Sequence, residues 1–155
     1  MATTLLIGGK MDTKRSVLTD EHDLPLSVVL DEANRHDIKL LEEILDGIVT
    51  FRPDPTEDHP QNLCIDAGSG YTGSTEIVKQ REYIAHIRPR GDEKKEKEQN
   101  PNFKARRWVV EVTHSFFNRF RKLLVRFEKK AANYLFLLQF ACAIIVWRKL
   151  IPVHR

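Results

Sequence analysis

Two acidic residues stand beside groups that bind metals or phosphates. Asp66 ends the apolar run NLCIDA before a glycine-rich turn, and Glu111 lies in RRWVVEVTHSFFNRF among arginines and bulky apolar side chains. A carboxylate at the carboxyl end of a strand can hold Mg²⁺, which prefers oxygen ligands. The same pattern suits an Asx turn at Asp66. Likewise, an ion pair between Arg107 and Glu111 would contribute only about 0.2–0.5 kcal/mol. These residues alone leave metal binding and a structural role open.

Basic and polar residues accompany both acids. On a helix, three side chains recur on the face of Glu111, with Arg119 adjacent to it: His114, Asn118 and Arg121. Four more arginines flank the charge run from 90 to 104: Arg88, Arg90, Arg106 and Arg107. Because guanidinium is planar and bidentate, these residues predict salt-dependent contact with a nucleic-acid backbone. The glutamates inside the charge run favour the alternative of a solubilising loop.

The composition indicates one globular domain. The chain has 155 residues, 41% apolar and 30% charged, which allows a sizeable core and is not typical of disorder. Net charge is only +3, but acids crowd the first part of the chain and most Lys and Arg follow Lys79. This asymmetry indicates a polyanionic partner for the C-terminal half.

The cysteines and histidines suggest no metal or disulfide framework. Cys64 and Cys142 lie in apolar runs without a CxxC pattern or a secretion signal, so we expect reduced thiols in a cytoplasmic protein. The histidines lack regular ligand spacing. The patterns of P-loop proteins, serine hydrolases and zinc proteases are absent from the sequence.

Periodicity and turn residues predict an α/β domain. KRSVLT and LPLSVVLD should form a hairpin that turns at Glu21–Asp23, and NLCIDA and YIAHIRP should be further strands. ANRHDIKLLEEILDGI and STEIVKQRE are expected helices, and the proline-rich RPDPTEDHPQ is an expected loop.

Two long helices are expected at the end of the chain. The first should run from 105 to 129 and bury one stripe: Val109, Val112, Phe116, Phe120, Leu123 and Phe127. The second, NYLFLLQFACAIIVWRKL, is apolar on nearly every side, which favours a buried helix. A membrane span is the alternative, but it needs about 20 apolar residues, and this run contains Asn133 and Gln139.

Several of these stretches resemble, in order, the catalytic domain of bacterial insertion-sequence transposases of the DDE type. They are LPLSVVLDEANRHDIKLLEEIL, LCIDAG…GYTG, YIAHIRPRGDEKKEK and the segment from Lys104 to Leu150. The resemblance implies an RNase H-like fold, which is a mixed sheet flanked by helices. It implies one partial catalytic domain over residues 1–155, with a divergent start at 1–13 and a charged loop at 90–104.

In that family, two Asp and one Glu bind divalent metal for DNA cleavage and strand transfer. The resemblance matches Asp66 to the second Asp and Glu111 to the Glu, so both are expected to be catalytic and to bind Mg²⁺ or Mn²⁺. It matches Arg107 and Arg119 to DNA-contacting positions, with Asn118 beside them. DNA is therefore the expected partner, with a second copy or a full-length transposase as a further one and no membrane.

The chain departs from the family pattern near its start. MATTLLI carries no acid where the first Asp is expected, the turn between Asp66 and Tyr71 is longer than usual, and no helix–turn–helix precedes the domain. We therefore expect an incomplete sheet, weak metal binding and a fragment with impaired activity. The alternatives are a non-catalytic remnant that binds DNA or another transposase, and a membrane or partner-helix protein.

The stretch TTLLI could form a strand in the incomplete sheet. Thr3–Ile7 has the β-branched and apolar composition of a strand, and Gly8 and Gly9 could supply a turn after it. We expect this segment to fill part of the central gap.

Overall fold

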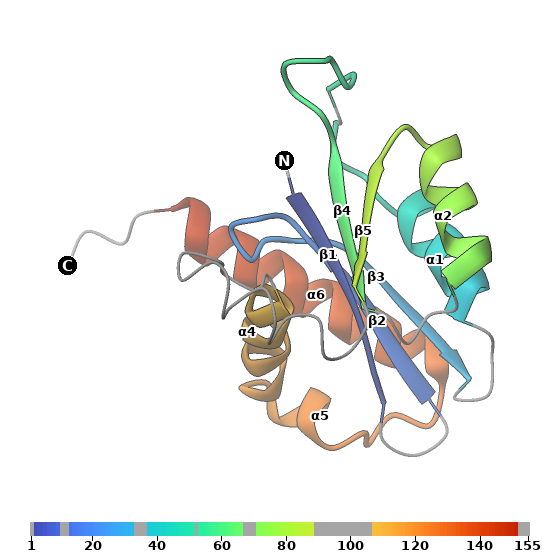
Figure 1. Cartoon of the computed structure of the whole chain (residues 1–155). Helices are drawn as coiled ribbons and strands as arrows, with labels where there is room; N and C mark the ends of the chain where they lie inside the picture. Colours follow the sequence, from blue (N-terminus) through green and yellow to red (C-terminus); the bar gives the residue numbers. More distant parts are fainter. Residues whose placement is uncertain are drawn as a thin grey trace, which may run out of the picture.

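The computed structural model describes residues 2–9, 13–32, 37–51, 53–66, 71–88 and 107–151. Five strands form one mixed sheet: β1 (Ala2–Gly9), β2 (Thr13–Thr19), β3 (Pro25–Glu32), β4 (Asn62–Asp66) and β5 (Ile84–Arg88). The spatial order is β3-β2-β1-β4-β5, and β1 lies at the centre (Figure 1). β1 pairs antiparallel with β2 and parallel with β4. The predicted α/β class and the strand hypothesis for Thr3–Ile7 are confirmed.

The described helices cover the two faces of this sheet: α1 (Asp37–Asp46), α2 (Tyr71–Gln80), α4 (Arg107–Asn118), α5 (Arg121–Leu124) and α6 (Ala131–Leu150). One core cluster packs α1 and α2 against the sheet through Ile44, Leu63 and Val78. The other packs α4, α5 and α6 against the opposite face through Val17, Phe117 and Leu138. Figure 1 shows α1 and α2 on one side of the strands and α4 and α6 on the other.

The start of the chain contains one wrong prediction. Gly8 and Gly9 do not form a turn, because they continue β1 opposite Arg15 and Lys14 of β2. Antiparallel pairing with β2 thus extends through both glycines, and the connection between the strands falls at residues 10–12, outside the described part of the structure.

The predicted hairpin of β2 and β3 is confirmed, and Asp20 closes it. Asp20 Oδ1 accepts hydrogen bonds from the backbone N–H groups of His22, at 2.9 Å, and Leu24, at 2.8 Å. Asp23 has φ of 60°, a left-handed conformation that Asp adopts more readily than most residues. The carboxylate of Asp20 therefore stabilises the turn of the hairpin.

The predicted long helix from 105 to 129 is wrong as one element. α4 ends at Asn118, where the N–H groups of Arg119 and Phe120 bond carbonyls three residues back, at 3.1 and 3.0 Å. Phe120 is extended, and the chain turns into the short α5. This turn lets Leu123 pack in the second core cluster, where its carbonyl accepts a hydrogen bond from the Tyr134 hydroxyl at 3.2 Å.

The buried residues of this region differ in part from the predicted stripe. Phe117 and Thr113 are fully buried although neither belongs to the predicted stripe. Phe127, predicted to be in the stripe, is 71% exposed because it follows α5 instead of extending α4.

The prediction that α6 is buried is confirmed for one side of the helix and wrong for the other. One side of it packs against the sheet and α5 through Tyr134, Leu138, Ala141 and Ile145, while the outer side leaves apolar residues exposed: Phe136, Phe140, Trp147 and Leu150. The Phe136 and Phe140 rings stack at 6.3 Å between centroids. By length and composition alone, α6 could cross a membrane. However, a helix in the core of a soluble protein can satisfy the same criterion.

Candidate functional site

Asp66 is the last residue of β4, at the carboxyl end of the strand as predicted. Its backbone pairs with that of Arg88, the last residue of β5. Residues 67–70 lie outside the described part, and α2 begins at Tyr71. The structure thus brings Asp66 and Arg88 to neighbouring positions at one edge of the sheet, as far as the backbone describes them.

Glu111 lies in the first half of α4, which packs against β1 and β2. Since β4 is the other neighbour of β1, the two acid-bearing elements meet around the central strand (Figure 1). For Glu111 and Arg107 the described structure gives the backbone and not the side chain. Arg90 and Arg106 lie outside the described residues.

The central strand supplies no acid to this arrangement. β1 has the sequence ATTLLIGG, and its parallel register with β4 runs to Leu5 opposite Ile65. If this register continues by one residue, position 6 of β1 lies opposite Asp66 of β4. A chain with a carboxylate on each of β1, β4 and α4 would have three acids around this point, whereas this one has two.

The other described acids near the sheet do not replace the missing one. Asp20 follows Thr19, which pairs with Thr4, so it lies three positions along β1 from the level of Asp66. Asp31 on β3 is at the same edge as Asp66, but three strand spacings separate β3 from β4, or about 14 Å. Within the described part of the chain, no group of three or more His, Cys, Asp or Glu side chains could hold a metal ion.

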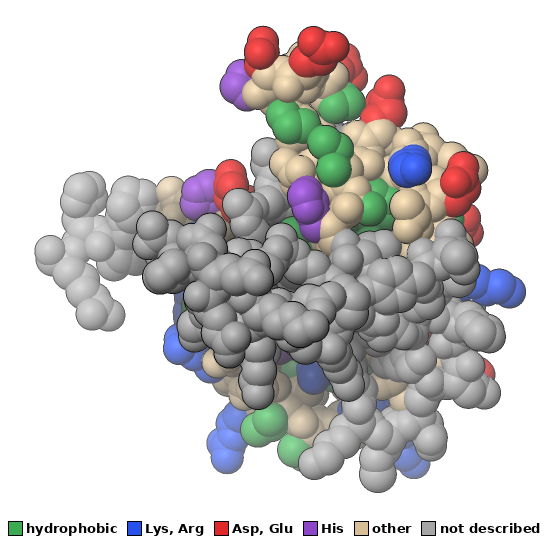
Figure 2. All heavy atoms as spheres, in the orientation of Figure 1, with side chains coloured by type: hydrophobic (Ala, Val, Ile, Leu, Met, Phe, Trp, Pro, Cys, Tyr) green, Lys and Arg blue, Asp and Glu red, His purple; other side chains and the backbone are tan. Residues whose placement is uncertain are grey.

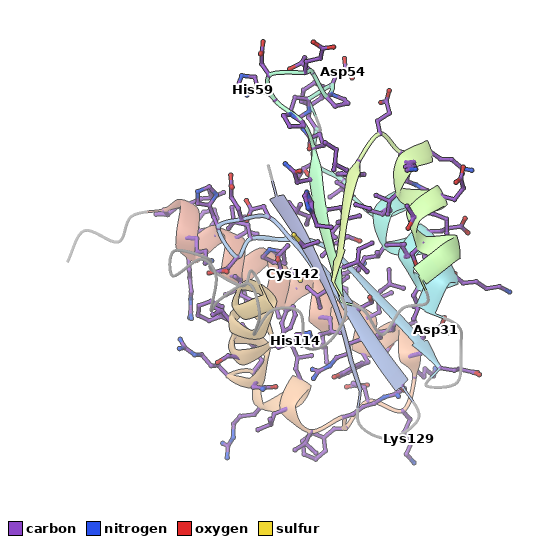
Figure 3. All side chains as sticks on the ribbon, in the orientation of Figure 1. Asp31, Asp54, His59, His114, Lys129 and Cys142 are labelled. Carbon is purple, nitrogen blue, oxygen red and sulfur yellow. The ribbon has the colours of Figure 1, made fainter. Side chains whose placement is uncertain are left out.

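His114 was predicted to contact DNA, and the structure places it against the core instead. Its ring meets the buried Phe117 ring edge-on, with centroids 6.2 Å apart, and Figure 3 shows it on the sheet side of α4. Burial, with a smaller effect of the positive charge on Arg15, lowers the pKa of His114 from 6.5 to about 4. A neutral, half-buried imidazole is poorly suited to a direct phosphate contact.

The depressed pKa of His114 predicts acid destabilisation. The unfolded chain binds this proton more tightly than the folded one, so stability is lost as the pH falls from 6.5 towards 4. Between pH 7 and pH 5 the free energy of unfolding should fall by roughly 2 kcal/mol through this residue. Urea titrations of the wild-type chain and His114→Gln at both pH values would measure the difference.

A matched control is His59→Gln, since His59 is exposed in a loop. This variant tests whether the loss of a histidine elsewhere in the chain has the same effect on stability as the loss of His114. If His114→Gln loses as much stability on acidification as the wild type does, the burial of a neutral His114 is contradicted.

Asn118, Arg119 and Arg121 are exposed at the end of α4 and the start of α5, where they are free to meet a ligand. Arg119 lies over the Phe116 ring at 4.9 Å, and Lys149 of α6 lies 5.6 Å from the same ring. Lys149 also pairs with Asp23, at 3.5 Å, so it ties α6 to the hairpin turn. Lys149 could not be predicted as part of this region, because nothing in the local sequence pattern links α6 to residue 23.

Comparison with known proteins decides the family. Residues 8–146 match the family model described as Transposase DDE domain. The chain belongs to this family. It is also 30% identical over 144 residues to the Burkholderia cepacia protein named "Putative transposase for insertion sequence element IS402". The match covers 89% of this chain and 64% of that protein, so the chain spans less than two thirds of its relative's length.

The predicted resemblance to insertion-sequence DDE transposases is therefore confirmed. The match includes both β4 with Asp66 and α4 with Glu111.

Proposed function

We propose that the chain is catalytic-domain material of an insertion-sequence DNA transposase with an RNase H-like fold, and that Asp66 and Glu111 occupy its metal-ligand positions. The supporting observation is the sheet order, in which β4 lies directly beside the central strand that α4 covers. The cytoplasmic location and the association with a second copy or a full-length transposase stay predictions.

The alternation of β4 supports the assignment of Asp66. Leu63 and Ile65 are buried in the cluster with α1 and α2. Strand alternation therefore assigns positions 62, 64 and 66 to the opposite face, where α4 lies. His86 and Asn62 agree with this assignment, since their side chains meet at 2.7 Å across β5 and β4. Position 66 and the helix of Glu111 thus share one face of the sheet.

The residues present do not supply a full set of metal ligands. In a three-carboxylate set, bound Mg²⁺ or Mn²⁺ activates the attacking oxygen and stabilises the leaving one. This chain offers carboxylates on β4 and α4 but none on β1. We therefore expect the chain to bind the ion weakly. Its own contribution is to bind DNA through arginines that include Arg107, Arg119 and Arg121.

A metal titration tests the two carboxylates. Weak Mn²⁺ binding, measured by water proton relaxation, should be lost in Asp66→Asn and in Glu111→Gln. It should be unchanged in Asp46→Asn, because Asp46 is an exposed acid that pairs with Arg81 at 2.8 Å away from these elements. Equal binding by all four proteins would contradict the assignment.

A nicking assay tests the incomplete set. Supercoiled plasmid incubated with the chain and Mn²⁺ should be nicked slowly or not at all. Efficient nicking that Glu111→Gln abolishes would show that two carboxylates suffice.

A non-catalytic binding role is the second candidate, favoured by the acid-free β1. It predicts DNA retention that weakens with salt and is unaffected by Asp66→Asn. Partition of the purified chain into the soluble fraction would separate both candidates from a membrane protein built on α6.

A further inference from the structure

The segment from Arg119 to Lys130 carries six cations and a single acid. The acid, Glu128, receives a hydrogen bond from Asn133 at 3.3 Å. Arg126 is held over the Tyr134 ring at 5.4 Å and bonds Thr13 and the Glu128 carbonyl. The other cations are exposed: Arg119, Arg121, Lys122, Lys129 and Lys130.

These five cations are available to an external anion. Among the residues that the structure describes, none of the five forms an ion pair with an acidic side chain. Figure 2 shows Lys and Arg side chains along the lower rim of the molecule, whereas most visible Asp and Glu side chains gather in the upper part. Figure 3 places Lys129 at the same lower edge. The described part of the rim is therefore predominantly basic, which suits a polyanion.

An aromatic side chain lies within this basic segment. Phe127 is 71% exposed, between the cations of α5 and the pair Lys129 and Lys130. Its ring contributes little to either core cluster. Cations alone would suit a duplex and a single strand alike, because both carry phosphates. An exposed ring among them suits bases that are unstacked, since an aromatic side chain stacks on the face of an unpaired base.

We propose that one exposed surface, the α5 surface, binds DNA with unpaired bases. It consists of Arg119, Arg121, Lys122, Phe127, Lys129 and Lys130. The cations hold the phosphates, and the Phe127 ring stacks on a base. This inference rests on the proposed function, which identifies the polyanion as DNA. It adds a surface that is separate from Asp66 and Glu111 and requires no metal.

The experiment compares binding of the full chain to a labelled oligothymidylate and to a duplex of matching length, by fluorescence anisotropy in EDTA across a salt series. Phe127→Ala should weaken binding of the single strand roughly 5- to 100-fold and leave the duplex unchanged. Lys129→Gln with Lys130→Gln should weaken both by roughly tenfold, and should reduce the salt slope by about 1.8 for the duplex and about 1.4 for the single strand. All of these side chains are exposed, so the variants should fold, which circular dichroism would verify.

Two controls match the chemistry at other places. Phe51→Ala removes a ring that is 93% exposed in a loop, and Lys39→Gln with Lys79→Gln removes two exposed cations from α1 and α2. Both controls should bind like the wild type. Equal effects of the control and test variants would overturn the α5 surface.

Other outcomes are equally decisive. If Phe127→Ala weakens strand and duplex alike, or neither, base stacking is overturned. If it weakens only binding to anionic phospholipid vesicles, the surface binds lipid and not DNA. Failure of DNA binding in EDTA would overturn this inference, while the Mn²⁺ titration would still decide the proposed carboxylates.

Discussion

Replacing Leu6 with aspartate is expected to raise the affinity of the chain for Mn²⁺ roughly tenfold or more, because a third carboxylate adds charge and oxygen ligands to the site. The register of β1 with β4 ends at Leu5 opposite Ile65, so position 6 is the next one towards Asp66. Neighbouring strands lie about 4.8 Å apart. Of the residues in β1, position 6 is thus the one whose level matches the end of β4.

The matched control is Leu6→Asn, which has nearly the same shape without the charge. Both variants should lose stability, since β1 is the central strand of the sheet. Only the aspartate variant should regain thermal stability on addition of Mn²⁺, because an ion that binds the folded state raises its unfolding midpoint. An equal response of the two variants, or a folded Leu6→Asp chain with no gain in affinity, would contradict the placement of the site beside β1.

The elements predicted correctly are those whose local pattern is unambiguous. The alternation in LPLSVVLD predicts a strand, and the polar residues Glu21–Asp23 before it predict a turn. The structure agrees, because β2 and β3 form a hairpin with this turn. Thr3–Ile7 was predictable as a strand from composition. Its central position was expected from the gap that the family resemblance revealed.

The C-terminal elements could not be predicted because their pattern lacks the necessary information. The turn after Asn118 contains neither glycine nor proline. The carbonyl of Leu123, after this turn, accepts a hydrogen bond from the Tyr134 hydroxyl of the next long helix, a contact that local pattern does not predict. α6 is apolar on all sides, so periodicity cannot distinguish its packed side from its exposed side. The pattern of apolar residues thus fixed neither the break in the first helix nor the burial of the second.

The residues of the candidate site were likewise predictable only in part. Asp66 and Glu111 came from the family resemblance, and the fold brings their elements together around β1. His114 recurs at helical spacing with Glu111, but periodicity cannot show that its ring packs against Phe117. The cations Lys122, Arg126 and Lys129 are visible in the sequence, but a continuous helix from 105 to 129 would not set them apart as a separate surface.

Phe117→Ala is expected to lower the free energy of unfolding by about 3–5 kcal/mol, the cost of removing a buried phenyl ring and leaving a cavity. Phe117 is 0% exposed. It joins α4 to Val17 of β2 and to Leu138 of α6 within the second core cluster. Because a domain of this kind is stable by only about 5–15 kcal/mol, the loss would be a large part of the total. Urea denaturation followed by circular dichroism would measure it.

Phe136→Ala is the control, since that ring is 64% exposed on the outer side of α6. It should change stability by no more than about 0.5 kcal/mol. Because Phe117 also anchors the helix that carries Glu111, Phe117→Ala should weaken Mn²⁺ binding in the absence of urea. Phe136→Ala should leave Mn²⁺ binding unchanged. If the two substitutions cost the same, the outer side of α6 is buried in solution, and a second chain or another partner must cover it.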